Sequence, residues 1–250
     1  MRSHALNEHI ALIQEAKKSC SIPIIASINC YSDNEWVDFA VMMEQAGADA
    51  LEINILSLQT SKDYTFGSFE QRHIDILRHI KKVVKIPVIM KLGSNLTNPI
   101  ALINQLYANG AAAVVLFNRF YQPDINIDTQ TFTSSNVMST PNELADKIRW
   151  TAIASSQIPQ LDYAVSGGVH CAKGVIKSIL AGATAVQICS VIYQYGNKEI
   201  ENMKRELSVW MEENGYESIS QFKGKLNASA AGDVNPFERT QFMKYYSSHE

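Results

Sequence analysis

The sequence repeats one pattern three times, and this repeat limits the folds open to the chain. An Ile-Pro pair opens an apolar run at Ile22-Pro23, Ile86-Pro87 and Ile158-Pro159. A Gly-Ala pair opens a second apolar run 24 or 25 residues later, at Gly47-Ala48, Gly110-Ala111 and Gly182-Ala183. A helical pattern follows each run, which is typical of stacked βαβα units. The repeat therefore predicts six parallel strands, in an architecture that normally closes with eight.

The six apolar runs are predicted to be strands because they are short, rich in β-branched residues and apolar on both faces. They are Ile24–Ile28, Ala50–Ile53, Val88–Met90, Ala113–Phe117, Tyr163–Val165 and Ala185–Ile188. The predicted helices are Asn34–Gln45, Phe69–Val84, Pro99–Asn109, Pro141–Ser155, Ala172–Leu180 and Glu199–Glu213. This alternation predicts an α/β fold, a TIM (β/α)8-type barrel that is incomplete, with six βα units and right-handed crossovers.

Composition points to one domain over residues 1–250 and to small-molecule partners. The chain is 46% hydrophobic, enough for one large core, and its net charge of −3 without charge blocks argues against nucleic acid or a membrane surface. The four cysteines have no CxxC spacing, and no His or Cys cluster resembles a metal site. The segment Met1–Lys18 has no apolar stretch of the export type. We therefore expect a cytoplasmic protein without a bound metal.

Polar residues follow directly after the predicted strands, where such barrels place their chemistry. They are Asn29, Asn54, Lys91, Asn118, Ser166-Gly167-Gly168 and Cys189-Ser190. Three Asn and a Lys at these positions favour a ligand site over simple strand-ending turns. The last two loops of such barrels often bind phosphate, and Gly167-Gly168 with Cys189-Ser190 supply backbone and hydroxyl donors there. Ordinary tight turns are the alternative for these glycines.

Lys91 has two candidate functional roles at the barrel mouth. Its ammonium group suits a place beside a flavin, where it would stabilise negative charge, or a Schiff base with a carbonyl substrate. The surrounding sequence IPVIMKLG favours an inward side chain over one that extends into solvent.

The segments ADALEIN, IPVIMKLGSNLTN, AAAVVLFNRFYQPDI, SGGVH and AGATAVQICS resemble the dihydroorotate dehydrogenase family, in particular a bacterial class-1-like branch. The resemblance covers about Asn7 to Tyr246. It implies that FMN lies across the barrel mouth with its phosphate on the last two loops. It assigns contacts with the cofactor to Asn29, Asn54, Lys91, Phe117, Gly167, Gly168, Cys189 and Ser190.

The resemblance also implies a reaction, in which dihydroorotate or a related cyclic amide is oxidised to orotate in de novo pyrimidine biosynthesis by hydride transfer to the flavin. It assigns catalysis to Ser57 and Lys91, and substrate binding to Asn54, Gln59, Asn118 and Arg119. The family's base motif is Asn-x-Ser-Cys/Ser-Pro-Asn, whereas this chain reads Asn-Ile-Leu-Ser-Leu-Gln from Asn54 to Gln59. The motif's Pro is absent, and a serine hydroxyl needs help to act as a base.

The family begins with two further βα units, so the resemblance implies that this chain carries strands 3–8 and lacks the N-terminal two units. Unpaired edges would then remain, which favours a homodimer or a partner that closes the barrel. Two alternatives stay open: a truncated or degenerate barrel without independent activity, and a phosphate-sugar aldolase that uses Lys91.

Three other regions carry predictions. The long polar segment Arg119–Thr140 is expected to form a lid or a subunit contact, and His170 is a candidate phosphate donor. His73 and His79 are expected on a solvated helix face. The tail 217–250 is expected to be helical and to pack on the barrel or on a partner.

Overall fold

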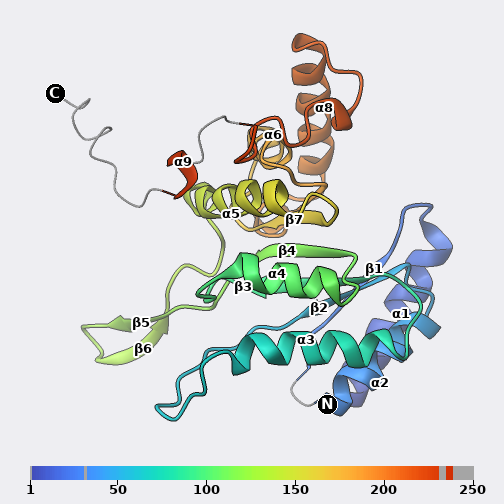
Figure 1. The fold of residues 1–250 in the computed structure, drawn as a ribbon, viewed down its shortest axis with the longest axis vertical. Coiled ribbons are helices and arrows are strands. Elements are labelled where there is room, and N and C mark those ends of the chain that lie inside the picture. Colours follow the sequence, from blue (N-terminus) through green and yellow to red (C-terminus); the bar gives the residue numbers. More distant parts are fainter. Residues whose placement is uncertain (1, 31–32, 231–234, 239–250) are drawn as a thin grey trace.

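The centre of the fold is a six-stranded parallel sheet (Figure 1), seen in a computed structural model that describes residues 2–30, 33–230 and 235–238. The strands are β1 (Ile25–Ile28), β2 (Ala50–Asn54), β3 (Val88–Gly93), β4 (Ala113–Asn118), β7 (Asp162–Ser166) and β8 (Ala185–Gln187). Their order in the sheet is β1-β2-β3-β4-β7-β8, and every neighbouring pair is parallel. Sequential order with parallel pairing is what repeated right-handed βα units produce.

Helices connect the strands and cover the sheet. They are α1 (Arg2–Ser19), α2 (Asp33–Gln45), α3 (Ser68–Lys81), α4 (Pro99–Ala108), α5 (Leu144–Gln157), α6 (Ala172–Leu180), α7 (Ser190–Tyr195), α8 (Lys198–Glu213) and α9 (Asn235–Glu238), with short 3-10 turns at Pro141–Glu143 (η1) and Ile219–Gln221 (η2). All six predicted strands and the six predicted connecting helices are present. The prediction of an α/β fold of the incomplete (β/α)8 type is confirmed, since β1 and β8 each pair with one strand in the described sheet.

The core lies between the sheet and the helices because both faces of the central strands are apolar. Four consecutive residues of β2, Ala50–Ile53, are buried. Helix α3 presents Leu77 and Ile80, each fully buried, and α4 presents Ile103 in the same cluster. Continuous burial of this kind is expected for parallel strands covered by crossover helices. Among the described helices, none combines the length and apolar character that a membrane span requires.

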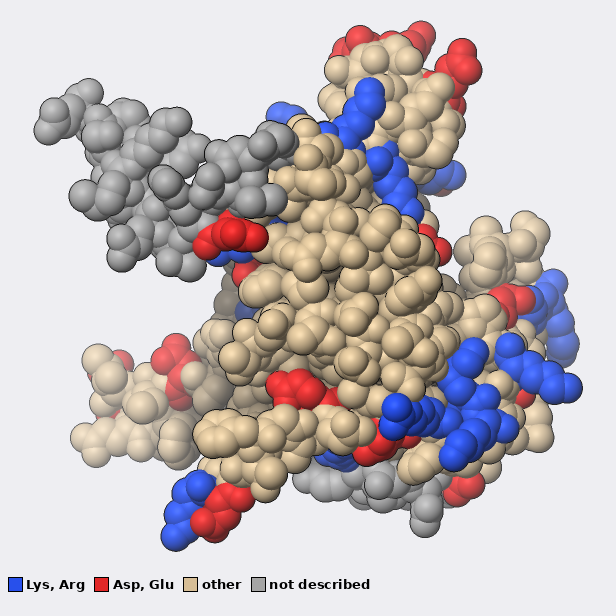
Figure 2. All heavy atoms as spheres, viewed as in Figure 1, with Lys and Arg blue, Asp and Glu red and all other residues tan. Residues whose placement is uncertain are grey.

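The predicted lid, Arg119–Thr140, is largely a β-hairpin. Its strands, β5 (Pro123–Asn126) and β6 (Thr131–Ser134), pair antiparallel and are exposed along their whole length. Figures 1 and 2 show the hairpin standing clear of the body of the molecule. Ile127 and Phe132 are 81% and 86% exposed. The hairpin therefore offers an apolar surface outward, and only the ends of the segment approach the strand ends of the central sheet.

The tail after α8 returns to the body of the molecule. Phe222 is fully buried, and the backbone N–H groups of Gly224 and Leu226 donate to the last carbonyls of α6, Ile179 and Leu180, both at 2.9 Å. The bond from Leu226 satisfies a carbonyl of the last helical turn, and Gly224 adds a donor to the Ile179 carbonyl, which also accepts from Gly182 N–H at 2.9 Å. The remainder of the predicted tail, residues 231–234 and 239–250, lies outside the described residues.

His73 corrects one expectation, because it is fully buried rather than on a solvated face; only His79 is exposed. Its Nδ1 lies 2.7 Å from the carbonyl oxygen of Phe69, which can only accept, so Nδ1 carries a proton and donates it. Its Nε2 has no partner among the described residues. Burial is the main cause that lowers the pKa of His73 below its ordinary value.

Tyr163 ties the start of β7 to the end of α5. Its side chain is buried, and its hydroxyl, with a single proton, lies 3.0 Å from the carbonyl oxygen of Ala154 and 2.8 Å from that of Ile158. We expect Tyr163→Phe to lower the free energy of unfolding by about 1 kcal/mol, because one buried hydrogen bond is lost while both carbonyls keep a backbone donor. Urea unfolding followed by circular dichroism measures this. The exposed Tyr107 gives the control, Tyr107→Phe, and an equal loss in both variants would contradict the assignment.

Protonation of His73 should weaken the fold at acid pH. Its pKa is lower in the folded chain than in the unfolded chain, so the unfolded state binds the proton first. Stability is then complete above the unfolded pKa, about 6.5, and falls as the pH decreases below that value. His73→Leu should flatten this slope in urea titrations between about pH 7 and pH 5, whereas His79→Leu should keep it. An unchanged slope in His73→Leu would contradict the prediction.

Candidate functional site

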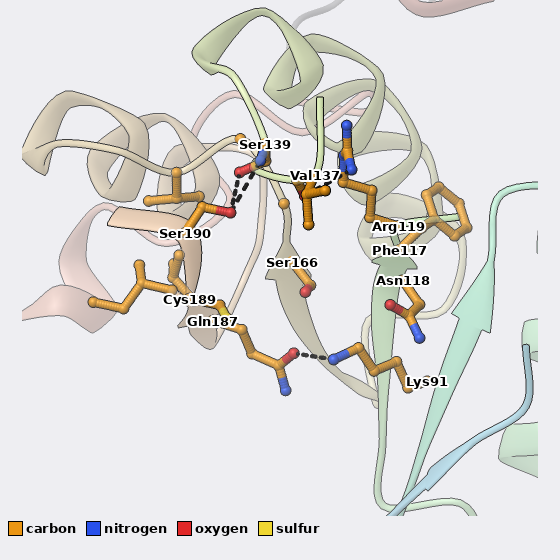
Figure 3. A pocket seen from close by; sticks show the side chains of 15 residues that line it. Lys91, Phe117, Asn118, Arg119, Val137, Ser139, Ser166, Gln187, Cys189 and Ser190 are labelled. Atoms are coloured by element: carbon orange, nitrogen blue, oxygen red, sulfur yellow. Dashed lines mark hydrogen bonds between the residues drawn. The ribbon is translucent and has the colours of Figure 1, made fainter. Parts of the chain in front are cut away.

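A cavity of about 670 Å³ opens at the carboxyl ends of β3, β4, β7 and β8. Its volume lies within the range of small-molecule sites, about 300–1,000 Å³. Eight of the predicted site residues line it: Lys91, Phe117, Asn118, Arg119, Gly167, Gly168, Cys189 and Ser190. Figure 3 shows how Lys91, Asn118, Cys189 and Ser190 lie around one space between the strand ends. The expectation that polar residues after the strands meet at one mouth thus holds for this part of the sheet.

Four predicted residues lie outside the cavity lining. Asn29 is exposed just after β1, and Asn54 ends β2 half-buried. Ser57 and Gln59 lie in the loop between β2 and α3, where Gln59 Nε2 donates to Ser57 Oγ at 3.0 Å. Asn95 Nδ2 donates to the Ser57 carbonyl at 3.1 Å and so ties this loop to the loop after β3. The site assignments of these four residues stay predictions.

One end of the cavity is rich in hydroxyl groups. Ser139 precedes η1, and its Oγ donates to Ser190 Oγ at 3.1 Å, while Ser190 Oγ also accepts from the Ser139 backbone N–H at 3.0 Å. His170 Nε2 lies 2.9 Å from Ser139 Oγ. Figure 3 shows Ser139 and Ser190 together at this end. Ser190 also begins α7, directly after β8. Neutral hydroxyl and backbone donors of this kind suit an anion.

The structure needs glycine at both positions after β7, but for different local reasons. Both have positive φ, 95° for Gly167 and 79° for Gly168, a conformation that favours glycine. A Cβ on Gly168 would lie 2.5 Å from the backbone N of Leu144, so α5 begins against this glycine. A Cβ on Gly167 would meet only Lys147 Cε at 3.6 Å and the Phe117 carbonyl at 3.9 Å. Gly167 thus keeps its backbone open toward the cavity, whereas Gly168 permits close packing.

The other end of the cavity carries a charged side chain held by two acceptors. Lys91 Nζ donates to Gln187 Oε1 at 2.8 Å and lies 3.4 Å from Glu52 Oε1. Gln187 Nε2 donates to Glu52 Oε2 at 2.5 Å, and Ser27 Oγ donates to Glu52 Oε1 at 2.7 Å. Lys91 therefore points inward among polar groups and does not extend into solvent, as the sequence predicts. Glu52 is buried, with four strands contributing to its surroundings.

Two further predicted residues form contacts within the protein. Asn118 Nδ2 donates to Asn54 Oδ1 at 2.6 Å, which joins the ends of β2 and β4 across β3. Arg119 donates to Glu143 Oε2 at 3.0 Å and to the carbonyls of Val137 at 2.9 Å and Asn136 at 2.6 Å. The guanidinium group thereby fixes the segment that leads from the hairpin to η1. This segment carries Ser139 into the cavity.

Glu52, Gln187 and Ser139 are polar residues at the site that were not predicted from the sequence, and the first two leave a signal in the sequence. Glu52 stands inside the apolar strand ADALEIN, and Gln187 stands inside ATAVQIC. A charged or amide side chain within a buried strand needs a partner, and so marks a polar interior. Ser139 lies in a polar stretch where nothing distinguishes it from its neighbours. Its place depends on the path of the chain after the hairpin.

The donors that line the cavity suit an anion joined to a flat polar heterocycle. Hydroxyl groups and an open glycine backbone at one end suit a phosphate, while Lys91 and Asn118 at the other suit the polar edge of a flat heterocycle. Over the described ranges, no group of three or more His, Cys, Asp or Glu side chains is placed to hold a metal. The four cysteines are free, and burial raises the pKa of Cys30 to about 12.

Known proteins resemble this chain over most of its length. The family model described as "Dihydroorotate dehydrogenase" matches residues 3–211. A relative from Thermoplasma volcanium, named dihydroorotate dehydrogenase B (NAD(+)), catalytic subunit, is 33% identical over 222 residues, which are 87% of this chain and 71% of the relative. A relative of the same name from Caldicellulosiruptor bescii is 29% identical over 217 residues, 84% of this chain and 70% of that protein.

A third relative broadens the comparison. The protein named dihydroorotate dehydrogenase A (fumarate) from Lactobacillus helveticus is 27% identical over 209 residues, which are 82% of this chain and 68% of that protein. The family match covers all six strands of the central sheet and every residue that lines the cavity. On these findings, the chain belongs to the dihydroorotate dehydrogenase family.

Proposed function

We propose that the protein is an FMN-dependent oxidoreductase that oxidises dihydroorotate, or a related cyclic amide, to orotate in pyrimidine biosynthesis. Membership of the family and the oxidoreductase names of the relatives support the reaction class. One observation about the chain itself carries the cofactor assignment. Its cavity has neutral hydroxyl donors at one end and the Lys91 ammonium group at the other, the two kinds of group that a flavin phosphate and a flavin ring require.

The phosphate end is proposed to use Gly167, Ser190 and Ser139. Gly167 leaves its backbone accessible, and the two serine hydroxyls already lie within 3.1 Å of each other. A bound phosphate would accept from these hydroxyls in place of their mutual bond. Gly168 and Cys189 complete the wall, and His170 lies behind Ser139. The site thus offers a ready set of donors that needs no large movement.

At the ring end, Lys91 and Asn118 are proposed to bind the pyrimidine edge of the flavin and the substrate. FMN supplies the hydride acceptor when it is bound. Phe117, which is buried, would form the apolar floor, and Asn54 holds Asn118 through the bond between their side chains. Asn29, Gln59 and Arg119 remain proposed contacts. The chain's own task is to orient a planar substrate and to exclude water from it.

Ser57 is proposed to take the substrate proton. Its hydroxyl oxygen accepts a hydrogen bond from Gln59 Nε2, and a donor on that oxygen favours the deprotonated form that a base requires. Ser57 is only half-buried, and its loop is fixed at one point by Asn95. A movement of this loop toward the cavity would complete the site, as is common for loops that close over substrates.

We further propose that residues 1–250 act as one catalytic domain that contacts another polypeptide, either a second copy or a different subunit. Two of the relatives are named catalytic subunits, and the hairpin presents Ile125, Ile127 and Phe132 to solvent. Exposed apolar patches often mark such contacts. The alternative of a Schiff-base aldolase is less well supported, because Lys91 Nζ donates to two acceptors rather than standing free as a nucleophile.

The proposed cofactor site is tested by flavin retention. We expect protein incubated with FMN to keep the visible absorption of oxidised flavin after desalting. Ser190→Ala should weaken FMN binding about tenfold, since it removes a donor to a charged group, but should leave riboflavin binding unchanged because riboflavin has no phosphate. Ser208→Ala on the exposed face of α8 is the control. Protein that fails to retain FMN, or a variant that loses both flavins equally, would contradict the proposal.

The proposed base is tested by anaerobic flavin reduction. With dihydroorotate as reductant, Ser57→Ala should slow bleaching of bound FMN by about 100-fold or more, while FMN affinity stays at the wild-type value because Ser57 does not line the cavity. Ser61→Ala changes a serine in the same loop and should reduce at the wild-type rate. Equal rates for wild type and Ser57→Ala would remove Ser57 from catalysis.

A further inference from the structure

Glu52 and Gln187 have no role in the proposed function, yet both hold Lys91. The three side chains form a closed ring: Lys91 Nζ to Gln187 Oε1 at 2.8 Å, Gln187 Nε2 to Glu52 Oε2 at 2.5 Å, and Glu52 Oε1 to Lys91 Nζ at 3.4 Å. The side chain of Glu52 is 5% exposed and that of Lys91 15%. The ring therefore lies in a largely dehydrated place, where charge–charge interactions are strong.

The ring fixes the direction of the Lys91 ammonium group. A lysine side chain is long and flexible, and its ammonium group has three N–H donors. Gln187 and Glu52 take two of these donors from β8 and β2, on either side of β3. The third donor is the one left for a ligand in the cavity that Lys91 lines. Figure 3 shows the Lys91–Gln187 contact at the floor of this space.

The hydrogen-bonded ring of Lys91, Gln187 and Glu52 also determines how much positive charge Lys91 presents to the cavity. Glu52 is an ion-pair partner of Lys91, and Ser27 and Gln187 donate to the same carboxylate. Two hydrogen bonds and the ion pair with Lys91 satisfy this buried carboxylate. Its negative charge offsets the positive charge of Lys91 as seen from the cavity. A ligand at the Lys91 end of the cavity therefore contacts an ammonium group whose charge is partly offset by Glu52.

We propose that Glu52 and Gln187 are positioning residues that aim Lys91 at the flavin and set the midpoint potential of the bound flavin. This inference rests on the proposed function of the site. Reduced flavin carries more negative charge on its ring than oxidised flavin, so a more positive surrounding favours the reduced form. Glu52 lowers the potential by offsetting Lys91, and Gln187 keeps the ammonium group in place.

The first test is the midpoint potential of bound FMN, measured by anaerobic reductive titration against a reference dye. Glu52→Gln keeps the size of the side chain and removes its charge. The potential should rise by about 30 mV, which is a tenfold change in the ratio of affinities for reduced and oxidised flavin. Asp49→Asn removes one negative charge just before β2, at its other end, and should leave the potential unchanged. An unshifted potential in Glu52→Gln overturns the proposal.

A second measurement needs no flavin. Acetic anhydride labelling followed by mass spectrometry should show Lys91 modified several-fold faster in both Glu52→Gln and Gln187→Leu than in wild type, with the exposed Lys204 as internal reference. Gln187→Leu leaves the ion pair in place, so it serves if Glu52→Gln fails to fold. Unchanged Lys91 labelling in the folded variants overturns the positioning role. If Lys91 is labelled faster in the variants but the wild-type protein does not bind FMN, the proposed function is wrong, whereas the positioning of Lys91 by Glu52 and Gln187 is supported.

Discussion

One buried carboxylate joins parts of the sheet that are far apart in the chain. Glu52 accepts from Ser27 on β1 and from Gln187 on β8, the two strands with only one neighbour in the described sheet. A buried charge without partners costs several kcal/mol, so the fold must bring these donors to it. Because β2 and β8 are not adjacent, this contact spans the inner face of a curved sheet. Glu52 thus joins both edge strands of the described sheet through its polar interior.

Sequence reasoning found the strands because their signals are local, and missed contacts whose partners are distant. Gln187 lies 135 residues from Glu52, and no periodic pattern links the two. The hairpin was missed because its strands are exposed on both faces, so the apolar runs used to recognise buried strands are absent. His73 was recoverable: it follows Phe69 by four residues and precedes Leu77 by four, on the apolar face of α3.

The eight predicted residues that line the cavity share a simple reason for being found. Each lies within three residues of the carboxyl end of a parallel strand, and those ends meet at one edge of the sheet. Ser139 reaches the cavity for a different reason, since it does not follow a strand of the central sheet. Gly168 lets the backbone of Leu144 approach to a distance that a side chain would forbid, and Arg119 holds the carbonyls of Asn136 and Val137. The chain between these two fixed points carries Ser139 to Ser190, so a packing glycine helps to shape a polar site.

The charges around the cavity explain why its two ends differ. The two cations in its lining are each paired with a carboxylate, Lys91 with Glu52 and Arg119 with Glu143. An anion at the hydroxyl end therefore meets mainly neutral donors, whose strength depends on direction rather than on net charge. The net charge that a ligand meets is set instead at the Lys91 end of the cavity, where the Glu52 carboxylate lies beside the Lys91 ammonium group in a dehydrated space. Under the proposed function, binding of the flavin phosphate and control of the flavin potential would rest on separate groups of side chains.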